Sequence, residues 1–210
     1  MRILVVDDHA VVRGGLRRLL SERFEGVTFG EAADGPEGVA MATNDSWELV
    51  ILDLSLPGRS GLEALKEIHA TRPKLPVLVM TMHSEEQYAV RAFRAGASGY
   101  VMKGAAEEDL VAAVEKTLAG GKYVTPELAE ALATSVGGGG GATLPHEALS
   151  DRELQVLRML AAGKTVKDIG AELGLSAKTI STYRTRILEK MRMRTTAQIV
   201  RYALASGLVE

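Results

Sequence analysis

Ile3-Leu4-Val5-Val6-Asp7-Asp8, a short apolar run that ends in two aspartates, is the first of several segments with the same design. Leu49-Val50-Ile51-Leu52-Asp53 repeats it, and the runs at 77–81 and 100–103 end in a threonine and a lysine. Short apolar runs bounded by turn residues are typical of buried strands in a parallel sheet. The carboxyl ends of such strands share one edge, where open α/β folds place their ligands. The pattern therefore predicts that three carboxylates, a hydroxyl and an ammonium group meet at that edge.

The first 120 residues alternate between strand-like and helical segments. The strand-like runs fall near residues 2–7, 27–31, 48–53, 76–81 and 98–102. The helical stretches cover residues 11–23, 36–43, 61–71, 85–95 and 107–119. Strands that alternate with helices in this way favour an α/β fold, here with a five-stranded parallel sheet covered on both faces. We expect this first domain to span residues 1–120.

A glycine run separates this region from a second, helical one. Residues 137–141 are all glycine, and such a run predicts a flexible tether because glycine loses the most conformational freedom on ordering. A short helix from Pro126 to about Ser135 precedes it. We assign residues 121–146 to this linker and residues 147–210 to a small all-α domain. Its four helices are expected at residues 151–162, 166–173, 177–191 and 196–205.

The composition describes an ordinary globular protein of one or two domains. Hydrophobic residues make up 46% of the 210 positions, enough for a sizeable core. The absence of cysteine excludes disulfides and thiolate metal sites. No apolar stretch approaches the roughly 20 residues that cross a bilayer, and the start lacks the apolar core of a signal peptide. We therefore expect a cytoplasmic protein without a membrane partner.

The charge is unevenly distributed along the chain. Residues 143–210 contain eleven Lys and Arg against seven Asp and Glu, whereas the remainder contains fourteen against twenty. An acidic first part and a basic second part indicate different partners for the two domains. Chance variation in surface charge is the alternative explanation for this feature taken alone.

The polar residues at the predicted sheet edge suit the transfer of a phosphoryl group. An ionised carboxylate can serve as the nucleophile by forming an acyl phosphate. Asp7 or Asp8, together with Asp53 and the backbone carbonyl of Ser55, would supply the oxygen ligands that Mg²⁺ prefers. The ammonium group of Lys103 would neutralise a phosphoryl oxygen, and the hydroxyl of a strand-end threonine would donate a hydrogen bond to another.

Each of these residues also has a plain structural explanation. An aspartate after a strand is often a helix cap or a turn former. Taken singly, Thr81, Tyr100 and Lys103 fit a strand end, the core and the solvent. His9 and His83 lie near the same edge, but no pattern makes them ligands, and capping or solvent exposure is expected of them. The functional interpretation rests on the coincidence of all the other residues at one edge.

These motifs resemble the receiver domain of two-component response regulators, which has a doubly wound, flavodoxin-like fold. The similarity runs from Ile3 to about Ala119 and rests on Val5-Val6-Asp7-Asp8-His9, Asp53-Leu54-Ser55-Leu56-Pro57-Gly58, Thr81-Met82-His83 and Gly99-Tyr100-Val101-Met102-Lys103. It implies that a sensor histidine kinase phosphorylates Asp53, that Asp7 and Asp8 hold Mg²⁺, and that Thr81 and Tyr100 form a coupled switch. Many relatives have proline after the lysine. This chain has Gly104, which leaves the geometry of the Lys103–Gly104 peptide open.

The second domain contains a candidate helix-turn-helix at residues 165–191. Its second helix divides by face, and the positions at core spacing are Ile180, Tyr183, Ile187, Leu188 and Met191. Another face presents Lys178, Ser181, Thr182 and Thr185. A recognition helix needs such an outward row of small polar and cationic groups to enter the major groove of DNA. An ordinary surface helix with a solvated basic face is the alternative.

Residues 149–157, 163–169 and 175–180 resemble the LuxR-type helix-turn-helix, and with the receiver they give the pattern of NarL/FixJ-type response regulators. The resemblance makes Lys178, Ser181, Thr182 and Thr185 the candidates for contacts with base edges. It makes Thr165, Lys167, Thr179, Arg184 and Arg186 the candidates for contacts with phosphates. The partners implied are double-stranded DNA, a sensor histidine kinase and a second copy of the chain, with dimerisation promoted by phosphorylation. RNA polymerase is a further candidate partner.

The leading hypothesis is a DNA-binding transcriptional regulator, not an enzyme, that is switched by phosphorylation of Asp53. One alternative is a hydrolase with an aspartyl nucleophile, but such enzymes need a second acid two residues further on, where this chain has Ser55. The other is a regulator that works without phosphorylation and uses the receiver only to dimerise.

Overall fold

The computed structural model describes residues 1–57, 60–82, 86–126, 128–130 and 144–209. The chain forms two compact units, Met1–Gly139 and Gly140–Glu210. Most of the predicted helix before the glycine run, and the run itself, lie outside the described residues. The predicted limits of the linker therefore stay a prediction.

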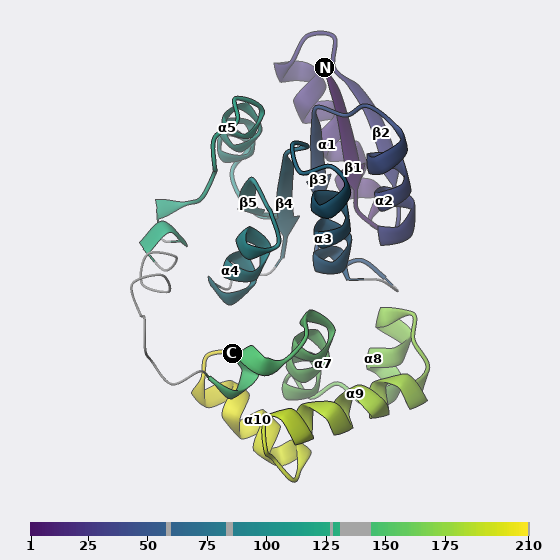
Figure 1. Cartoon of the computed structure of the whole chain (residues 1–210), viewed down its shortest axis with the longest axis vertical. Coiled ribbons are helices and arrows are strands. Elements are labelled where there is room, and N and C mark those ends of the chain that lie inside the picture. The colour runs from purple at the N-terminus through teal and green to yellow at the C-terminus, as the bar shows by residue number, and fades with distance from the viewer. Residues whose placement is uncertain (58–59, 83–85, 127, 131–143, 210) are drawn as a thin grey trace. The chain divides into compact units, whose positions relative to one another are not determined.

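The first unit is built around one parallel sheet. Its strands are β1 (Arg2–Val6), β2 (Thr28–Ala32), β3 (Leu49–Leu52), β4 (Val77–Thr81) and β5 (Gly99–Met102). They lie in the order β2-β1-β3-β4-β5, and every neighbouring pair is parallel (Figure 1). The predicted five-stranded parallel α/β fold is confirmed.

Four helices connect the strands, and a further helix follows the last strand. They are α1 (Ala10–Arg23), α2 (Gly35–Asn44), α3 (Gly61–Thr71), α4 (Glu86–Arg94) and α5 (Glu107–Leu118). These bounds agree with the predicted ones to within one residue, although Glu85, the predicted first residue of α4, lies outside the described residues. Leu16 and Leu20 of α1 pack with Leu110 and Val114 of α5 against one face of the sheet. Full burial of such side chains contributes about 1.5–3 kcal/mol each, so the apolar runs hold the sheet between its helices.

Glycine allows α3 to begin directly against the strand that precedes it. A Cβ atom at Gly61 would lie 2.1 Å from the backbone oxygen of Asp53 and 2.5 Å from the Cα atom of Leu54. The amide of Gly61 donates to the carbonyl of Leu54 over 3.1 Å, and the hydroxyl of Ser60 caps the helix. The start of α3 therefore fixes the backbone at the end of β3.

The second unit is helical throughout its described part. A short 3₁₀ helix, η1 (Pro145–Ala148), precedes α7 (Asp151–Ala161), α8 (Val166–Leu173), α9 (Ala177–Lys190) and α10 (Thr196–Ala205). The four predicted helices are confirmed, and η1 was not predicted because a single 3₁₀ turn has no apolar periodicity. Ser150 and Glu153 form a capping box at the start of α7.

A tight turn joins α8 to α9. Gly174 ends α8 with a left-handed backbone (φ 64°), and Ser176 caps α9. Gly170 lies under this turn, because a Cβ atom there would come within 2.7 Å of the carbonyl oxygen of Leu175. The amide of Leu175 donates back to the carbonyl of Gly170 over 2.8 Å. The two helices consequently form the predicted helix-turn-helix.

Substitution of Gly61 by alanine is expected to destabilise the first unit by about 1–3 kcal/mol, because the new methyl group overlaps the backbone of Asp53. Gly14→Ala is the matched control, since it lies inside α1 and a Cβ atom there would have no neighbour within 4 Å. It should stabilise the same unit by up to about 1 kcal/mol. Urea unfolding followed by fluorescence of Trp47, the single tryptophan, measures both. Equal effects of the two substitutions would contradict this role of Gly61.

Candidate functional site

Two buried carboxylates and one ammonium group meet at the carboxyl edge of the sheet. The Nζ atom of Lys103 lies 2.8 Å from Oδ2 of Asp7 and 2.8 Å from Oδ2 of Asp53. Both aspartates are only 1% exposed. The register of β1 on β3 pairs Val6 with Leu52, which places the next residue of each strand side by side. Lys103 follows β5 and reaches them across the end of β4.

Backbone amides bind the remaining oxygen of each carboxylate. The amide of His9 donates to Oδ1 of Asp7 over 2.8 Å, and the amide of Ser55 donates to Oδ1 of Asp53 over 3.0 Å. Each acid thus accepts from the amide two residues further on, the local pattern that aspartate favours at the end of a strand. The turn-forming role and the functional role considered for these aspartates therefore coexist.

Asp8 and His9 complete an acidic cluster. One ligand atom from each of Asp7, Asp8, His9 and Asp53 can be chosen so that all lie within 4.8 Å of one another. The Nδ1 atom of His9 is 2.8 Å from Oδ1 of Asp8 and 3.3 Å from Oδ1 of Asp7. His9 also occupies the N-cap position of α1 and its side chain is 63% exposed, but the imidazole makes no capping hydrogen bond. No sequence pattern indicated that this side chain turns toward the acids.

The protonation equilibria reflect this geometry. Burial raises the pKa of Asp53, and this outweighs the opposing hydrogen bonds from Lys103 and the Ser55 amide. Burial alone would lower the pKa of Lys103, but hydrogen bonds and charge attraction to Asp53 and Asp7 outweigh it and raise that pKa. Lys103 is therefore cationic at neutral pH. Ionisable groups whose pKa values are shifted both by burial and by a charged partner are typical of functional sites.

Thr81 and Tyr100 lie on neighbouring strands at the same edge. Thr81 ends β4, is fully buried, and its carbonyl accepts from the amide of Lys103 over 2.9 Å. The register pairs Thr81 with Met102, so Thr81 and Tyr100 share one face of the sheet. Tyr100 is 3% exposed, and burial, followed by the proximity of Tyr88 and Asp53, raises its pKa. The structure thus places Tyr100 in the core.

Arg13 is a residue of this site that the sequence did not reveal. Its Nη1 atom donates to the backbone carbonyl of Asp7 over 2.7 Å, and its Nε atom pairs with Oε2 of Glu31 over 2.9 Å. An arginine in the first turns of an amphipathic helix carries no sequence signal for such a contact. His83 lies outside the described residues. No peptide bond among the described residues is cis, so the Lys103–Gly104 peptide is trans.

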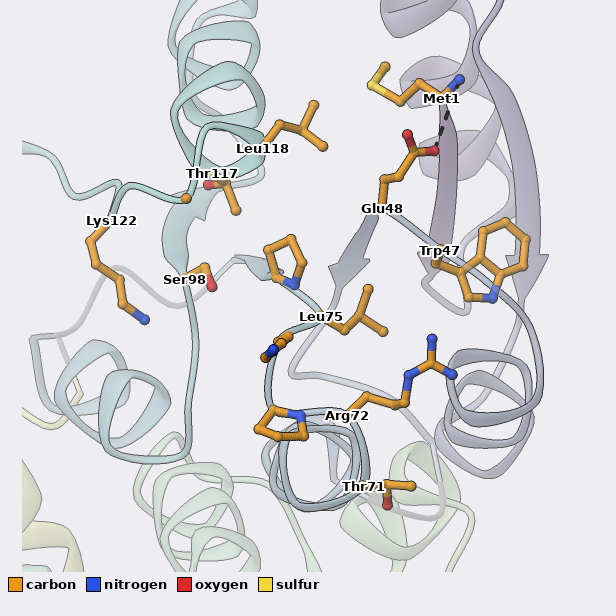
Figure 2. A pocket seen from close by; sticks show the side chains of 14 residues that line it. Met1, Trp47, Glu48, Thr71, Arg72, Leu75, Ser98, Thr117, Leu118 and Lys122 are labelled. Atoms are coloured by element: carbon orange, nitrogen blue, oxygen red, sulfur yellow. Dashed lines mark ion pairs between the residues drawn. The ribbon is translucent and has the colours of Figure 1, made fainter.

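A cavity of about 970 Å³ opens at the opposite, amino edge of the sheet and contains none of the predicted site residues (Figure 2). Two of its cationic side chains already donate to backbone carbonyls, Arg72 to Thr43 over 3.1 Å and Lys122 to Ala97. The carboxylate of Glu48 lies 4.0 Å from the amino group of Met1. Arg72, Lys122 and Glu48 therefore each already have a polar partner in the structure.

In the second unit, α9 separates its faces largely as predicted. Ile180, Ile187 and Met191 are buried, whereas Tyr183 and Leu188 are only half-buried. On the other side Lys178, Thr182, Thr185 and Arg186 are exposed, while Thr179, Ser181 and Arg184 are half-buried. Thr165 and Lys167, at the start of α8, are also exposed.

Two of the threonines predicted to contact phosphates serve as helix caps or partners of caps. The hydroxyl of Thr165 donates to Oδ2 of Asp168 over 2.6 Å within a capping box. The hydroxyl of Thr179 lies 2.8 Å from that of Ser176, which caps α9. Their local hydrogen bonds are sufficient to explain why threonine occupies these positions.

An ion pair fastens the end of α9 to the start of α7. The Nζ atom of Lys190 lies 2.6 Å from Oε2 of Glu153. Burial alone would raise the pKa of Glu153, but hydrogen bonds from Lys190 and Ser150 outweigh it and lower that pKa. This ion pair ties the last turn of α9 to the first turn of α7.

Comparison with known proteins identifies both units. The family model for the response regulator receiver domain matches residues 3–115, and that for bacterial regulatory proteins of the luxR family matches residues 147–203. The chain is 34% identical to the response regulator UvrY of Escherichia coli K12, covering 99% of this chain and 95% of that protein. It is 35% identical to the response regulator GacA of Pseudomonas aeruginosa PAO1, covering 100% and 98%.

A solved structure of RcsB from Salmonella enterica serovar Typhimurium, bound to promoter P1flhDC in the presence of the phosphomimetic BeF3⁻, is also similar. It superposes with a TM-score of 0.59 at 27% identity and covers 96% of this chain and 97% of that one.

A parallel five-stranded sheet with an acidic cluster at its carboxyl edge, joined to a helix-turn-helix, defines a two-component response regulator. The chain belongs to the response regulators that combine a receiver domain with a LuxR-family DNA-binding domain. It is a transcription regulator and not the hydrolase considered as an alternative. Within the described part of the chain, no helix has the length and apolarity required to span a membrane.

Replacing Asp8 by asparagine is expected to stabilise the metal-free receiver by about 1 kcal/mol. The change removes one of three clustered negative charges and keeps an oxygen that can accept from His9. If the cluster binds Mg²⁺, millimolar Mg²⁺ should stabilise the wild-type chain, and the same change should abolish most of that stabilisation. Urea unfolding of both proteins with EDTA and with Mg²⁺ measures these effects, and Glu25→Gln, at the other end of α1, is the control. Loss of stability in EDTA would refute the charge-cluster interpretation.

Proposed function

We propose that a sensor histidine kinase phosphorylates Asp53 and that this modification increases the affinity of the chain for double-stranded DNA. The observation that carries the proposal is the bridge of Lys103 between two buried carboxylates, because it puts a nucleophile beside a fixed cation. The proposed division is a receiver at residues 1–120, a linker at 121–146 and a DNA-binding domain at 147–210.

In the transfer step, a carboxylate oxygen of Asp53 attacks the phosphorus of a phosphohistidine. The new O–P bond forms as the P–N bond breaks, and the electron pair of that bond leaves with the imidazole of the kinase. Lys103 is already 2.8 Å from Asp53 and offsets the negative charge of the incoming phosphoryl group. Once an Asp53 oxygen bridges carbon and phosphorus in the acyl phosphate, the ammonium group is attracted to the phosphoryl oxygens instead.

The acidic cluster fits a magnesium ion by the chemistry of its donors. Asp7, Asp8 and Asp53 offer carboxylate oxygens within 4.8 Å of one another, and we propose the backbone carbonyl of Ser55 as a further ligand. Bound Mg²⁺ would neutralise charge on the phosphoryl oxygens. Asp7 and Asp53 also bind Lys103, so these two carboxylates would contact both the Mg²⁺ ion and the ammonium group of Lys103.

We propose that Thr81 and Tyr100 transmit the change. The buried hydroxyl of Thr81 would move to donate to a phosphoryl oxygen, and Tyr100 would be held in its buried position beside it. Helix α4 lies between these two residues in the chain and would shift with them. Phosphorylation has an effect only if the arrangement of the receiver before this change and the arrangement after it differ in their affinity for DNA or for a second copy of the chain.

The exposed row of α9 is proposed to enter the major groove of DNA. Lys178, Ser181, Thr182 and Thr185 would face base edges, and Lys167, Arg184 and Arg186, with Thr165 and Thr179 at the helix starts, would lie near phosphates. One such helix reads few base pairs, so we propose that a dimer binds two half-sites. The RcsB structure with a promoter and a phosphomimetic is consistent with this proposal.

Fluoroberyllate with Mg²⁺ is expected to raise the affinity of the wild-type chain for its DNA between about 5- and 150-fold, the usual range of coupling between two sites. Asp53→Ala should bind DNA with the affinity of the untreated wild-type chain and should not respond. Quantitative footprinting measures both, with Asp34→Ala, the cap of α2, as a control that should still respond. Identical protection by the wild-type chain and by Asp53→Ala, each with and without fluoroberyllate, would refute the switch and favour a regulator that works without phosphorylation.

Arg186→Ala is expected to weaken binding to all DNA sequences by a similar factor. If its exposed guanidinium contacts one phosphate, the slope of log K against log salt concentration should become shallower by about 0.9. The same substitution at Arg23, at the end of α1, is the matched control and should leave the slope unchanged. A change confined to one DNA sequence would mean that Arg186 reads a base.

A further inference from the structure

The hydroxyl groups of two threonines on the exposed row of α9 donate hydrogen bonds to backbone carbonyls of the same helix. The hydroxyl of Thr182 donates to the carbonyl of Lys178 over 3.0 Å, and that of Thr185 donates to the carbonyl of Ser181 over 3.1 Å. Both acceptors lie four residues earlier in the same helix. Both threonines are exposed, so the bonds form at the surface and not in the core.

This arrangement decides which part of each side chain can meet a partner. A threonine Cβ atom carries one hydroxyl and one methyl group, and a hydroxyl turned back onto the helix leaves the methyl group as the outer part. A hydroxyl whose proton is engaged can still accept a hydrogen bond, but it cannot donate one without breaking the bond that it makes. The outward surface at these two positions is therefore apolar.

The other members of the row differ. Lys178 is exposed and carries three donor hydrogens, while Ser181 is half-buried and has no methyl group. The same back-bond occurs at Thr71 of α3, whose hydroxyl donates to the carbonyl of Glu67 over 2.9 Å. A hydrogen bond from a threonine hydroxyl to the carbonyl four residues earlier is therefore not peculiar to α9. What distinguishes Thr182 and Thr185 is their place beside Lys178 on the helix that would face DNA.

We propose that Thr182 and Thr185 are specificity-determining residues that read the 5-methyl groups of thymines in the major groove. The inference rests on the proposed DNA-binding role of α9. The thymine methyl group is the apolar feature that a base edge offers there, and it matches an apolar side-chain surface. Residues three apart on a helix have Cβ atoms about 5–6 Å apart, and bases on one strand rise by about 3.4 Å. The two methyl groups therefore suit thymines one or two steps apart.

The test removes the methyl group of the thymine in one set of experiments and the methyl group of the threonine in another. The full chain is first used to select binding sites from random duplex DNA, and each thymine of the selected site is then replaced singly by deoxyuridine. One or two replacements should weaken binding by the wild-type chain about fourfold each, the loss expected for one buried methyl group.

Matched variants assign the contacts. Thr182→Ser and Thr185→Ser keep the hydroxyl and lose the methyl group, so each should lower affinity and remove the sensitivity to one deoxyuridine. Thr182→Val and Thr185→Val keep a methyl group and lose the hydroxyl, and they should retain both affinity and sensitivity. Thr71→Ser is the control for the substitution itself and should change nothing. Circular dichroism of each variant checks that the helices are intact.

Two results would overturn the inference while leaving DNA binding in place. One is tolerance of deoxyuridine at every position by the wild-type chain. The other is a loss of affinity in the valine variants that the serine variants do not share, because the hydroxyls would then read the bases. Failure of the selection to enrich any sequence would overturn the sequence-reading role of α9 itself, and the inference with it.

Discussion

The bond of one ammonium group to two buried carboxylates is the interaction on which the receiver depends. Without a cation between them, two like charges at the ends of β1 and β3 would face each other out of water, and one would take up a proton. Lys103, 2.8 Å from both Asp7 and Asp53, offsets the cost of burying these two carboxylates side by side. Any change in the charge on Asp53 therefore acts directly on Lys103, which follows β5, two strands away from β3 in the sheet.

The amino-acid sequence was sufficient to predict the fold because this kind of sheet leaves a strong pattern. Strands buried on both faces are continuous apolar runs, and the polar residue that ends each run marks the functional edge, so the pattern alone places Asp53, Thr81 and Lys103 there. The orientation of His9 and the contact of Arg13 with the carbonyl of Asp7 could not be predicted. They depend on how closely α1 approaches β1 and β2, which no local periodicity encodes.

In the helix-turn-helix, too, the apolar periodicity of the sequence predicted some features of the structure and not others. A period of 3.6 residues separates the buried Ile180 and Ile187 from the exposed Thr182 and Thr185, as predicted. Leu188, expected in the core, is only half-buried. It lies at the border of the apolar stripe, where periodicity alone does not fix burial. Periodicity also does not predict which atoms of a threonine face outward. That depends on whether the hydroxyl donates a hydrogen bond to the carbonyl four residues earlier, as it does at Thr182 and Thr185.

The charges of the two units limit how the proposed switch can work. Phosphorylation replaces the single negative charge of the Asp53 carboxylate by about −1.5 to −2 charges on the phosphoryl group. The chain, whose net charge is already −2, becomes more negative, and this opposes the approach of DNA. Screening beyond about 8 Å at physiological salt keeps that effect small, but its sign is unfavourable. An increase in DNA affinity after phosphorylation of Asp53 therefore cannot come from attraction between the modified site and the duplex. It must come from a shift between two arrangements of the receiver, or from pairing of two copies that brings two α9 helices to one site.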